Sequence, residues 1–109
     1  MASVFKNAGA QCVLVDDATA DIYTAPASTR AVLHAIMVSN TAATSAEKVT
    51  IKVMVDGGTT FKTMMSNIII PQNNTFILDK PVNLEANDII RVIASHGNTD
   101  TFISVLENT

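Results

Sequence analysis

Alternation of apolar and polar residues in the segment Lys48–Val55 is the sequence feature that most constrains the fold. The segment reads KVTIKVMV, with valine or isoleucine at every second position. A period of two is typical of a β-strand that buries one of its two faces. The residues that follow, Asp56-Gly57-Gly58, form the strongest hairpin signal in the sequence. We therefore expect Thr59–Ser66 to return as an antiparallel partner strand.

Segments of similar composition recur at intervals of about 8 to 12 residues, which is the spacing found in β-sandwiches and barrels. The chain has 109 residues, enough for a single domain with one hydrophobic core. The sequence shows no helical period, internal repeat or domain boundary. It therefore predicts an all-β domain of about eight strands. The further strand candidates are Gln11–Val15, Asp21–Thr24, Thr29–Asn40, Phe76–Leu78, Ile89–Ala94 and Asp100–Glu107.

Turn signals join several of these segments. Gln11–Val15 and Asp21–Thr24 are close enough in the sequence to pair as a hairpin. Further along, Pro81 lacks a backbone donor and Asn87-Asp88 tolerates turn geometry. We expect the chain to bend here and to re-enter the sheet through Ile89–Ala94, whose even-numbered residues form the buried face.

The longest strand candidate, Thr29–Asn40, is apolar on both faces. In an antiparallel domain this is unusual, and it implies that the second face is covered as well. The β-branched residues of the segment argue against a helix. Simple alternation places Val32, His34, Ile36 and Val38 on one face and Ala31, Leu33, Ala35 and Met37 on the other.

Residues 1–10 are expected to form an N-terminal arm ahead of a sandwich domain at residues 11–109. The arm consists of small and polar residues, and Phe5 is its only large apolar side chain. Such a segment is either loose or ordered by docking Phe5 on a neighbour. It could also add as a strand to an exposed sheet edge of a neighbouring subunit.

The composition argues against several classes of function. Lys and Arg number 7 against 10 Asp and Glu, so the net charge is −3 and a basic footprint for nucleic acid is absent. One Tyr and no Trp are too few aromatics for a groove that stacks on sugars. No apolar run approaches the ~20 residues of a membrane span, and the N-terminus lacks the apolar core of a signal peptide. The single cysteine, Cys12, lies among apolar residues and is expected to be a buried small hydrophobe.

Residues suited to catalysis or metal binding are sparse. The two histidines are expected to be structural, because His34 alternates with apolar residues and His96 lies beside a turn glycine. Asp16, Asp17 and Asp21 cluster in one loop, yet the loop lacks the glycine and the bidentate glutamate of a calcium site. A solvated turn is the simpler interpretation. We therefore predict no enzyme activity, no metal and no other cofactor.

Apolar residues point instead to association with other proteins. Several fall on strand faces that a two-layer domain need not bury, and together they would exceed the apolar patch of a typical monomer. Methionine suits adaptable packing against a partner. Ile89, Phe102 and Leu106 are among these positions. The candidate partner contacts are Phe5, Leu33, Met37, Met54, Met64 and Ile93.

Two stretches of the sequence carry a family resemblance. The first lies within Ile22–Asn40 and reads IYTAPASTRAVLHAI, then VSN. The second lies within Leu78–Val92 and contains LDKP and LEANDIIRV. Together they resemble a group of small virion proteins of tailed bacteriophages. The resemblance implies a single antiparallel β-sandwich, of the immunoglobulin-like or jelly-roll type, that acts by assembly.

On this resemblance we expect a virion protein that is made in the host cytoplasm. Its simplest role is capsid decoration, as a cement protein that contacts the major capsid protein or other virion proteins. We also expect a homo-oligomer, formed by symmetric self-association of Ala31–Ser39, and no contact with nucleic acid or membrane. A tail, neck or baseplate accessory protein is the first alternative. A host-glycan-binding module is the second, although the shortage of aromatics counts against it.

Overall fold

The structure is a computed structural model that describes residues 3–16, 18–41, 45–55, 60–95 and 99–108. Within these ranges the chain forms nine strands, one short 3-10 helix and no α-helix. The all-β prediction is therefore confirmed. The predicted turn at Asp56-Gly57-Gly58 lies outside the described residues, as do Asp17 and His96.

Most strands lie at or close to their predicted positions, and two were not predicted. The predicted strand at Gln11–Val15 is wrong, because β1 ends at Gln11 and residues 12–15 belong to no named strand. β7 occupies part of an expected bend. The elements are β1 (Ser3–Gln11), η1 (Ala18–Ala20), β2 (Asp21–Thr24), β3 (Arg30–Asn40), β4 (Glu47–Val55), β5 (Thr60–Ile70), β6 (Thr75–Leu78), β7 (Val82–Leu84), β8 (Ile89–Ala94) and β9 (Thr99–Asn108).

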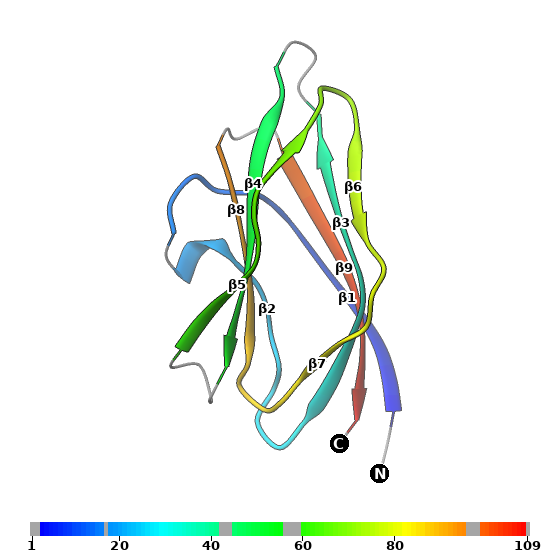
Figure 1. Cartoon of the computed structure of the whole chain (residues 1–109). Coiled ribbons are helices and arrows are strands. Elements are labelled where there is room, and N and C mark those ends of the chain that lie inside the picture. Colours follow the sequence, from blue (N-terminus) through cyan, green and yellow to red (C-terminus); the bar gives the residue numbers. More distant parts are fainter. Residues whose placement is uncertain (1–2, 17, 42–44, 56–59, 96–98, 109) are drawn as a thin grey trace.

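The strands form two antiparallel sheets that face each other (Figure 1). Sheet A has the order β1-β9-β3, and both β6 and β7 pair with the far edge of β3. Sheet B has the order β2-β8-β4-β5. The molecule is elongated, measuring 47 × 25 × 19 Å, and Ser3 pairs with Asn108 near one of its ends (Figure 1). The predicted single β-sandwich is confirmed.

The strand order identifies the sandwich as a jelly roll. β6 and β7 pair with successive parts of β3 and are separated only by Asp79-Lys80-Pro81, so they act as one interrupted strand. The antiparallel pairs are then first with last (β1·β9), second with seventh (β2·β8), third with sixth (β3·β6/β7) and fourth with fifth (β4·β5). This nested pairing across two sheets is the double Greek key of a jelly roll. Immunoglobulin-like sandwiches have a different strand order.

The core lies between the two sheets. Ile90, Val92 and Ala94 are buried, as the alternation of β8 predicted. The turn before β8 was also predicted: Asn87 has a φ of 69°, a left-handed conformation that asparagine tolerates. The largest fully buried apolar side chains are Leu33, Ile36, Val38, Val49, Ile51, Ile70, Leu84, Ile90, Val92, Ile103 and Val105.

A β-bulge in β3 overturns the predicted division of its faces. Pairing with β9 shifts register between Leu33 and Ala35, so His34 is an extra residue in the strand. Before the bulge the odd-numbered side chains of β3 face the core, and after it the even-numbered ones do. Leu33 and Ile36, on either side of the bulge, are both fully buried. The expectation that Leu33 lies on an outer face with Met37 is wrong, because simple alternation does not hold across the bulge.

The predicted hairpin between the first two strands is also wrong. β1 pairs with β9 in sheet A along its whole length, whereas β2 pairs with β8 in sheet B. The chain crosses between the sheets after β1, where the N–H of Cys12 donates to the carbonyl of Thr99 and the N–H of Ala94 donates to that of Val13. Residues 3–10, expected to be a separate arm, are thus part of an edge strand of the sandwich.

Candidate assembly surface

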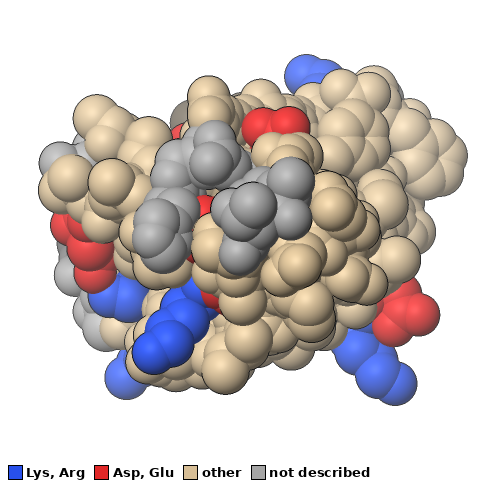
Figure 2. Space-filling model, turned by 90° about the horizontal axis from the view of Figure 1, so that it is seen from above, with Lys and Arg blue, Asp and Glu red and all other residues tan. Residues whose placement is uncertain are grey.

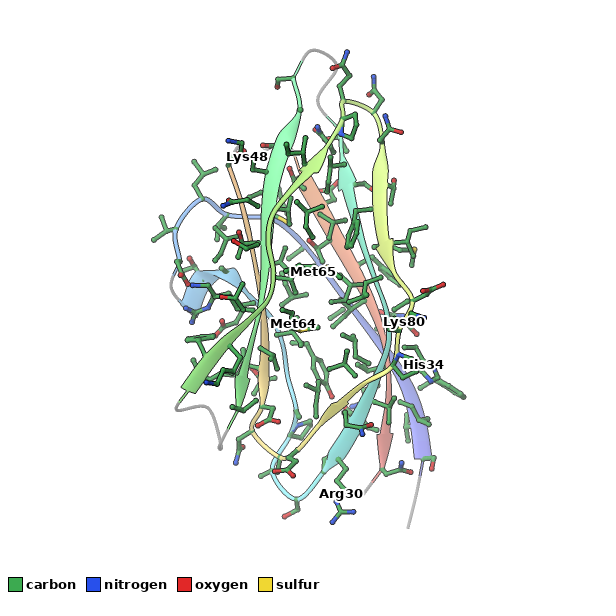
Figure 3. All side chains as sticks on the ribbon, viewed as in Figure 1. Arg30, His34, Lys48, Met64, Met65 and Lys80 are labelled. Atoms are coloured by element: carbon green, nitrogen blue, oxygen red, sulfur yellow. The ribbon has the colours of Figure 1, made fainter. Side chains whose placement is uncertain are left out.

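The structure places His34 away from the position that the sequence predicted. His34, expected at the edge of the core, is exposed on the outer side of sheet A. Its ring lies against that of Phe5, with centroids 5.8 Å apart, and it projects away from the sandwich (Figure 3). Among the described residues, no group of three or more His, Cys, Asp or Glu could hold a metal ion.

Cys12 is buried, as predicted, with 3% of its surface exposed. Its Sγ lies 2.8 Å from Thr101 Oγ1. Burial is the main reason why the pKa of the Cys12 thiol is raised above its usual value. The thiol is therefore protonated at neutral pH, and a protonated, buried thiol is a poor nucleophile.

Asp16, in the β1–β2 connection, and Asp21, at the start of β2, form ion pairs, which corrects their interpretation as part of a solvated turn. Arg91 donates from Nε to Asp21 Oδ1 at 2.7 Å and from Nη1 to Asp16 Oδ1 at 3.0 Å. Lys52 pairs with the other oxygen of Asp16, and the guanidinium of Arg91 lies 4.1 Å from the centroid of the Phe61 ring. These contacts attach the connection to the outer face of sheet B. The cluster is best explained as structural, because its charges neutralise one another.

The outer face of sheet A, called here the sheet A face, carries most of the exposed large apolar side chains that lie within strands. Directly opposed residues in antiparallel strands share a face, so the register defines rows across the sheet. The Phe102 row consists of Gly9, Phe102, Met37 and Ile77. The Phe5 row consists of Phe5, Leu106, Val32 and Asn83. Between them, the Ser104 row consists of Asn7, Ser104 and Ala35.

Exposure and charge distinguish these three rows from the rest of the face. Phe5 is 74% exposed, Ile77 58% and Phe102 44%, and the three rows contain no Asp, Glu, Lys or Arg. Charged residues occur in the rows beyond them, which contain Asp100 on one side and Arg30 on the other. An uncharged centre with two mainly apolar rows and a margin that contains charged residues has the composition of a protein interface.

One end of the sheet A face is hollowed into a shallow depression of about 590 Å³. Met37 and Phe102 line it on the side of the Phe102 row, and Ser39, Thr75 and Asp100 line it on the polar side. The hydroxyls of Ser39 and Thr75 lie 2.9 Å apart and are hydrogen-bonded to each other. In the view from that end of the molecule, Lys and Arg are interspersed with Asp and Glu and form no continuous basic patch (Figure 2).

The six predicted partner contacts are divided among three places. Phe5 and Met37 lie in the rows of the sheet A face. Leu33 is in the core, and Met64 packs against the core from the sheet B side (Figure 3). Met54 and Ile93 belong to sheet B, where they pair with Ile89 and Thr50.

Ile77 was not predicted, although it alternates with the core-facing Phe76 and Leu78 and could have been found from that pattern. Gly9 was not predicted either, because its position in a row depends on the pairing of β1 with β9. Phe102 and Leu106 were recognised as apolar surface positions, and they lie on β9, an inner strand of sheet A.

No helix among the described residues is long and apolar enough to cross a membrane. No protein-family model matches the chain, and the search of curated proteins finds no match.

Proposed function

We propose that this protein is a non-enzymatic structural protein of a tailed-bacteriophage virion that decorates the capsid and stabilises the shell. The observation that carries the proposal is the uncharged centre of the sheet A face, with its two mainly apolar rows and its charged margin. The sequence resemblance to small virion proteins supports it. The jelly roll is compatible with it, since viral capsid domains use this fold, but lectins and cupins do as well.

The sheet A face would act by burying its apolar rows against neighbouring shell subunits. Phe5, Phe102 and Ile77 are the most exposed large side chains of these rows. Full burial of one such side chain contributes about 1.5–3 kcal/mol. Many copies, each bridging two shell subunits, would therefore raise the free energy needed to separate those subunits.

A comparison of two isoleucines tests which face binds. Ile77 lies on the sheet A face and is 58% exposed, whereas Ile69 lies in β5 of sheet B and is 63% exposed. We expect Ile77→Asp to abolish co-sedimentation with capsids that have been stripped of this protein, and Ile69→Asp to leave it unchanged. Equal binding of both variants would remove the sheet A face from the proposal.

Fractionation of the source virion tests the location. Heads and tails are separated, and mass spectrometry counts the copies of this chain in each. Many copies in the head fraction support decoration. A few copies in the tail fraction assign the protein to the tail, neck or baseplate, and its absence from both fractions removes the virion role.

The depression beside the Phe102 row favours a second candidate function, binding of a host glycan. It combines an aromatic ring with hydroxyl and carboxylate oxygens from Ser39, Thr75 and Asp100, a combination that suits a sugar ring. A glycan array with no hit would exclude this alternative. A hit that Phe102→Ala removes would support it.

A further inference from the structure

Three of the four sheet edges carry features that hinder pairing with another strand. β2 has four residues, and its pairing with β8 shifts register between Asp21 and Tyr23. The edge formed by β6 and β7 is interrupted by Asp79-Lys80-Pro81. β5 shifts register twice against β4. Short strands, bulges, charges and proline are the means by which proteins protect sheet edges from other strands.

β1 forms the fourth edge and lacks the short length, the register shifts and the proline found at the other three. It runs for nine residues in unbroken register with β9. It contains no proline and one charged residue, Lys6. An edge of this kind presents a row of backbone donors and acceptors that another strand can use.

The hydrogen-bond pattern identifies the backbone groups of β1 that point away from sheet A. The N–H of Cys12 donates to the carbonyl of Thr99 at 2.6 Å, in continuation of the β1·β9 register. In an antiparallel pair, residues that bond to the partner alternate with residues whose backbone groups point to the other side. Counting back from Cys12, the even-numbered residues bond to β9. The N–H and C=O groups of Phe5, Asn7 and Gly9 therefore point to the open edge.

We propose that a second copy of this chain pairs antiparallel with β1 across this edge, with Asn7 opposite Asn7. Phe5 of each copy then lies opposite Gly9 of the other, and these three pairs exchange about six hydrogen bonds. Any other register that uses the same outward groups displaces the strands by at least two residues and shortens the ladder. A two-fold axis through the Asn7 pair relates the copies, so the assembly closes as a dimer.

The side chains of the sheet A face match this register. Gly9 is the only member of the Phe102 row without a side chain. Phe5 of the second copy pairs with it, and the Phe5 ring turns from its position against His34 to cover it. An aromatic residue next to an edge glycine shields the bare backbone. The Phe102 row of one copy thus continues into the Phe5 row of the other. Lys6 faces Ala8, so like charges are not opposed.

This self-complementarity is the reason for choosing a second copy rather than an unrelated strand. Within β1, the bulky Phe5 and the bare Gly9 lie at equal distances on either side of Asn7. An antiparallel copy therefore presents its phenylalanine to each glycine and its glycine to each phenylalanine. The proposed dimer does not depend on the virion role. Its contact is the β1 edge, whereas the sequence predicted self-association through Ala31–Ser39.

Light scattering on the purified full chain tests the proposal, since the dimer has twice the monomer mass of 11.6 kDa. Asn7→Pro is the disrupting variant. It removes an N–H that points to the open edge and is not used by β9, and proline is tolerated on such an edge. We expect wild type to be a dimer and the Asn7→Pro variant to be a folded monomer by circular dichroism.

Cysteine cross-linking tests the register. In the proposed dimer the two Asn7 Cα atoms are about 5.5 Å apart, within the range for a disulfide. Asn7→Cys should therefore form a covalent dimer on oxidation. Gln11→Cys, on the same strand and face, is the matched control, because it lies about 27 Å from its own counterpart. Wild type, whose Cys12 is buried, provides the background.

A wild-type monomer at the highest attainable concentration overturns the proposal, as does a dimer that persists in the folded Asn7→Pro variant. If Asn7→Pro does not fold, the comparison of the two cysteine variants decides between dimer and monomer. Cross-linking of Asn7→Cys that is no faster than that of Gln11→Cys then overturns the proposal. None of these results affects the virion role, which capsid binding by Ile77→Asp and Ile69→Asp tests separately.

Discussion

Tyr23 links the two sheets of the sandwich, and its replacement tests how much this link contributes to stability. Its hydroxyl, on β2 of sheet B, donates to Glu107 Oε2 on β9 of sheet A. The Glu107 side chain is 7% exposed, so its carboxylate depends on donors from the protein. A hydrogen bond to a charged group contributes about 1.5–3 kcal/mol. We expect Tyr23→Phe to lower the free energy of unfolding by about 2 kcal/mol, a fall of about 8 °C in Tm.

The same residue makes stability depend on pH. Burial, followed by the hydrogen bond and the negative charge of Glu107, raises the pKa of Tyr23 above its ordinary value. The folded state therefore holds the proton more tightly than the unfolded state, whose pKa is about 10. The stabilisation is complete below about pH 10 and is lost as the pH rises further. Tyr23→Phe should not show this loss.

Urea denaturation of both proteins at neutral pH and at about pH 11 measures the difference. Because the sequence has one Tyr and no Trp, tyrosinate absorbance also reports on Tyr23 alone. Lys6→Ala is the matched control: Lys6 Nζ lies 3.3 Å from Glu107 Oε1, but its side chain is 54% exposed, so the loss should stay below about 1 kcal/mol. A tyrosine that titrates near pH 10, with a Tyr23→Phe loss below about 0.5 kcal/mol, would refute the reasoning.

Other substitutions separate buried from exposed positions and test the ion pairs. Leu33→Ala should cost about 2–5 kcal/mol in urea denaturation and Met37→Ala less than about 1 kcal/mol, and equal costs would contradict the bulge in β3. Arg91→Ala should cost about 3 kcal/mol and Lys52→Ala less than about 1 kcal/mol, measured by thermal unfolding. Hydrogen bonds from Lys52 and Arg91 lower the pKa of Asp16, so its contribution is present at neutral pH and is lost as the pH falls below about 4. NMR titration of the Asp16 carboxyl carbon checks the direction, and a pKa at or above about 3.9 would contradict it.

The sequence located most strands because their signals are local. β4 and β8 were predicted from alternation alone, since each buries one side along its length. β1 and β7 were not. β1 is mostly exposed on both faces and consists largely of small residues, whereas β7 has three residues and follows a proline. Neither strand carries a pattern that differs from that of a loop.

The candidate surface was predicted only in part, for a related reason. Phe5 and Met37 were recognised as exposed apolar residues, and they do lie on the sheet A face. Leu33 was assigned to the wrong face because the bulge at His34 depends on pairing with β9, far along the chain. The alignment of Phe102 with Gly9 and Met37 in one row depends on three strands from distant parts of the sequence.

By itself, the sequence determined that this chain forms β-strands with one buried side, because the alternation of side chains is a property of each strand alone. Tertiary structure decided which strands pair, where β3 bulges and which apolar side chains gather on one face. Backbone donors and acceptors are nearly the same at every residue, so they do not specify a partner. The choice of partner depends on how all nine strands bury their apolar sides together, and that is settled only when both sheets are formed.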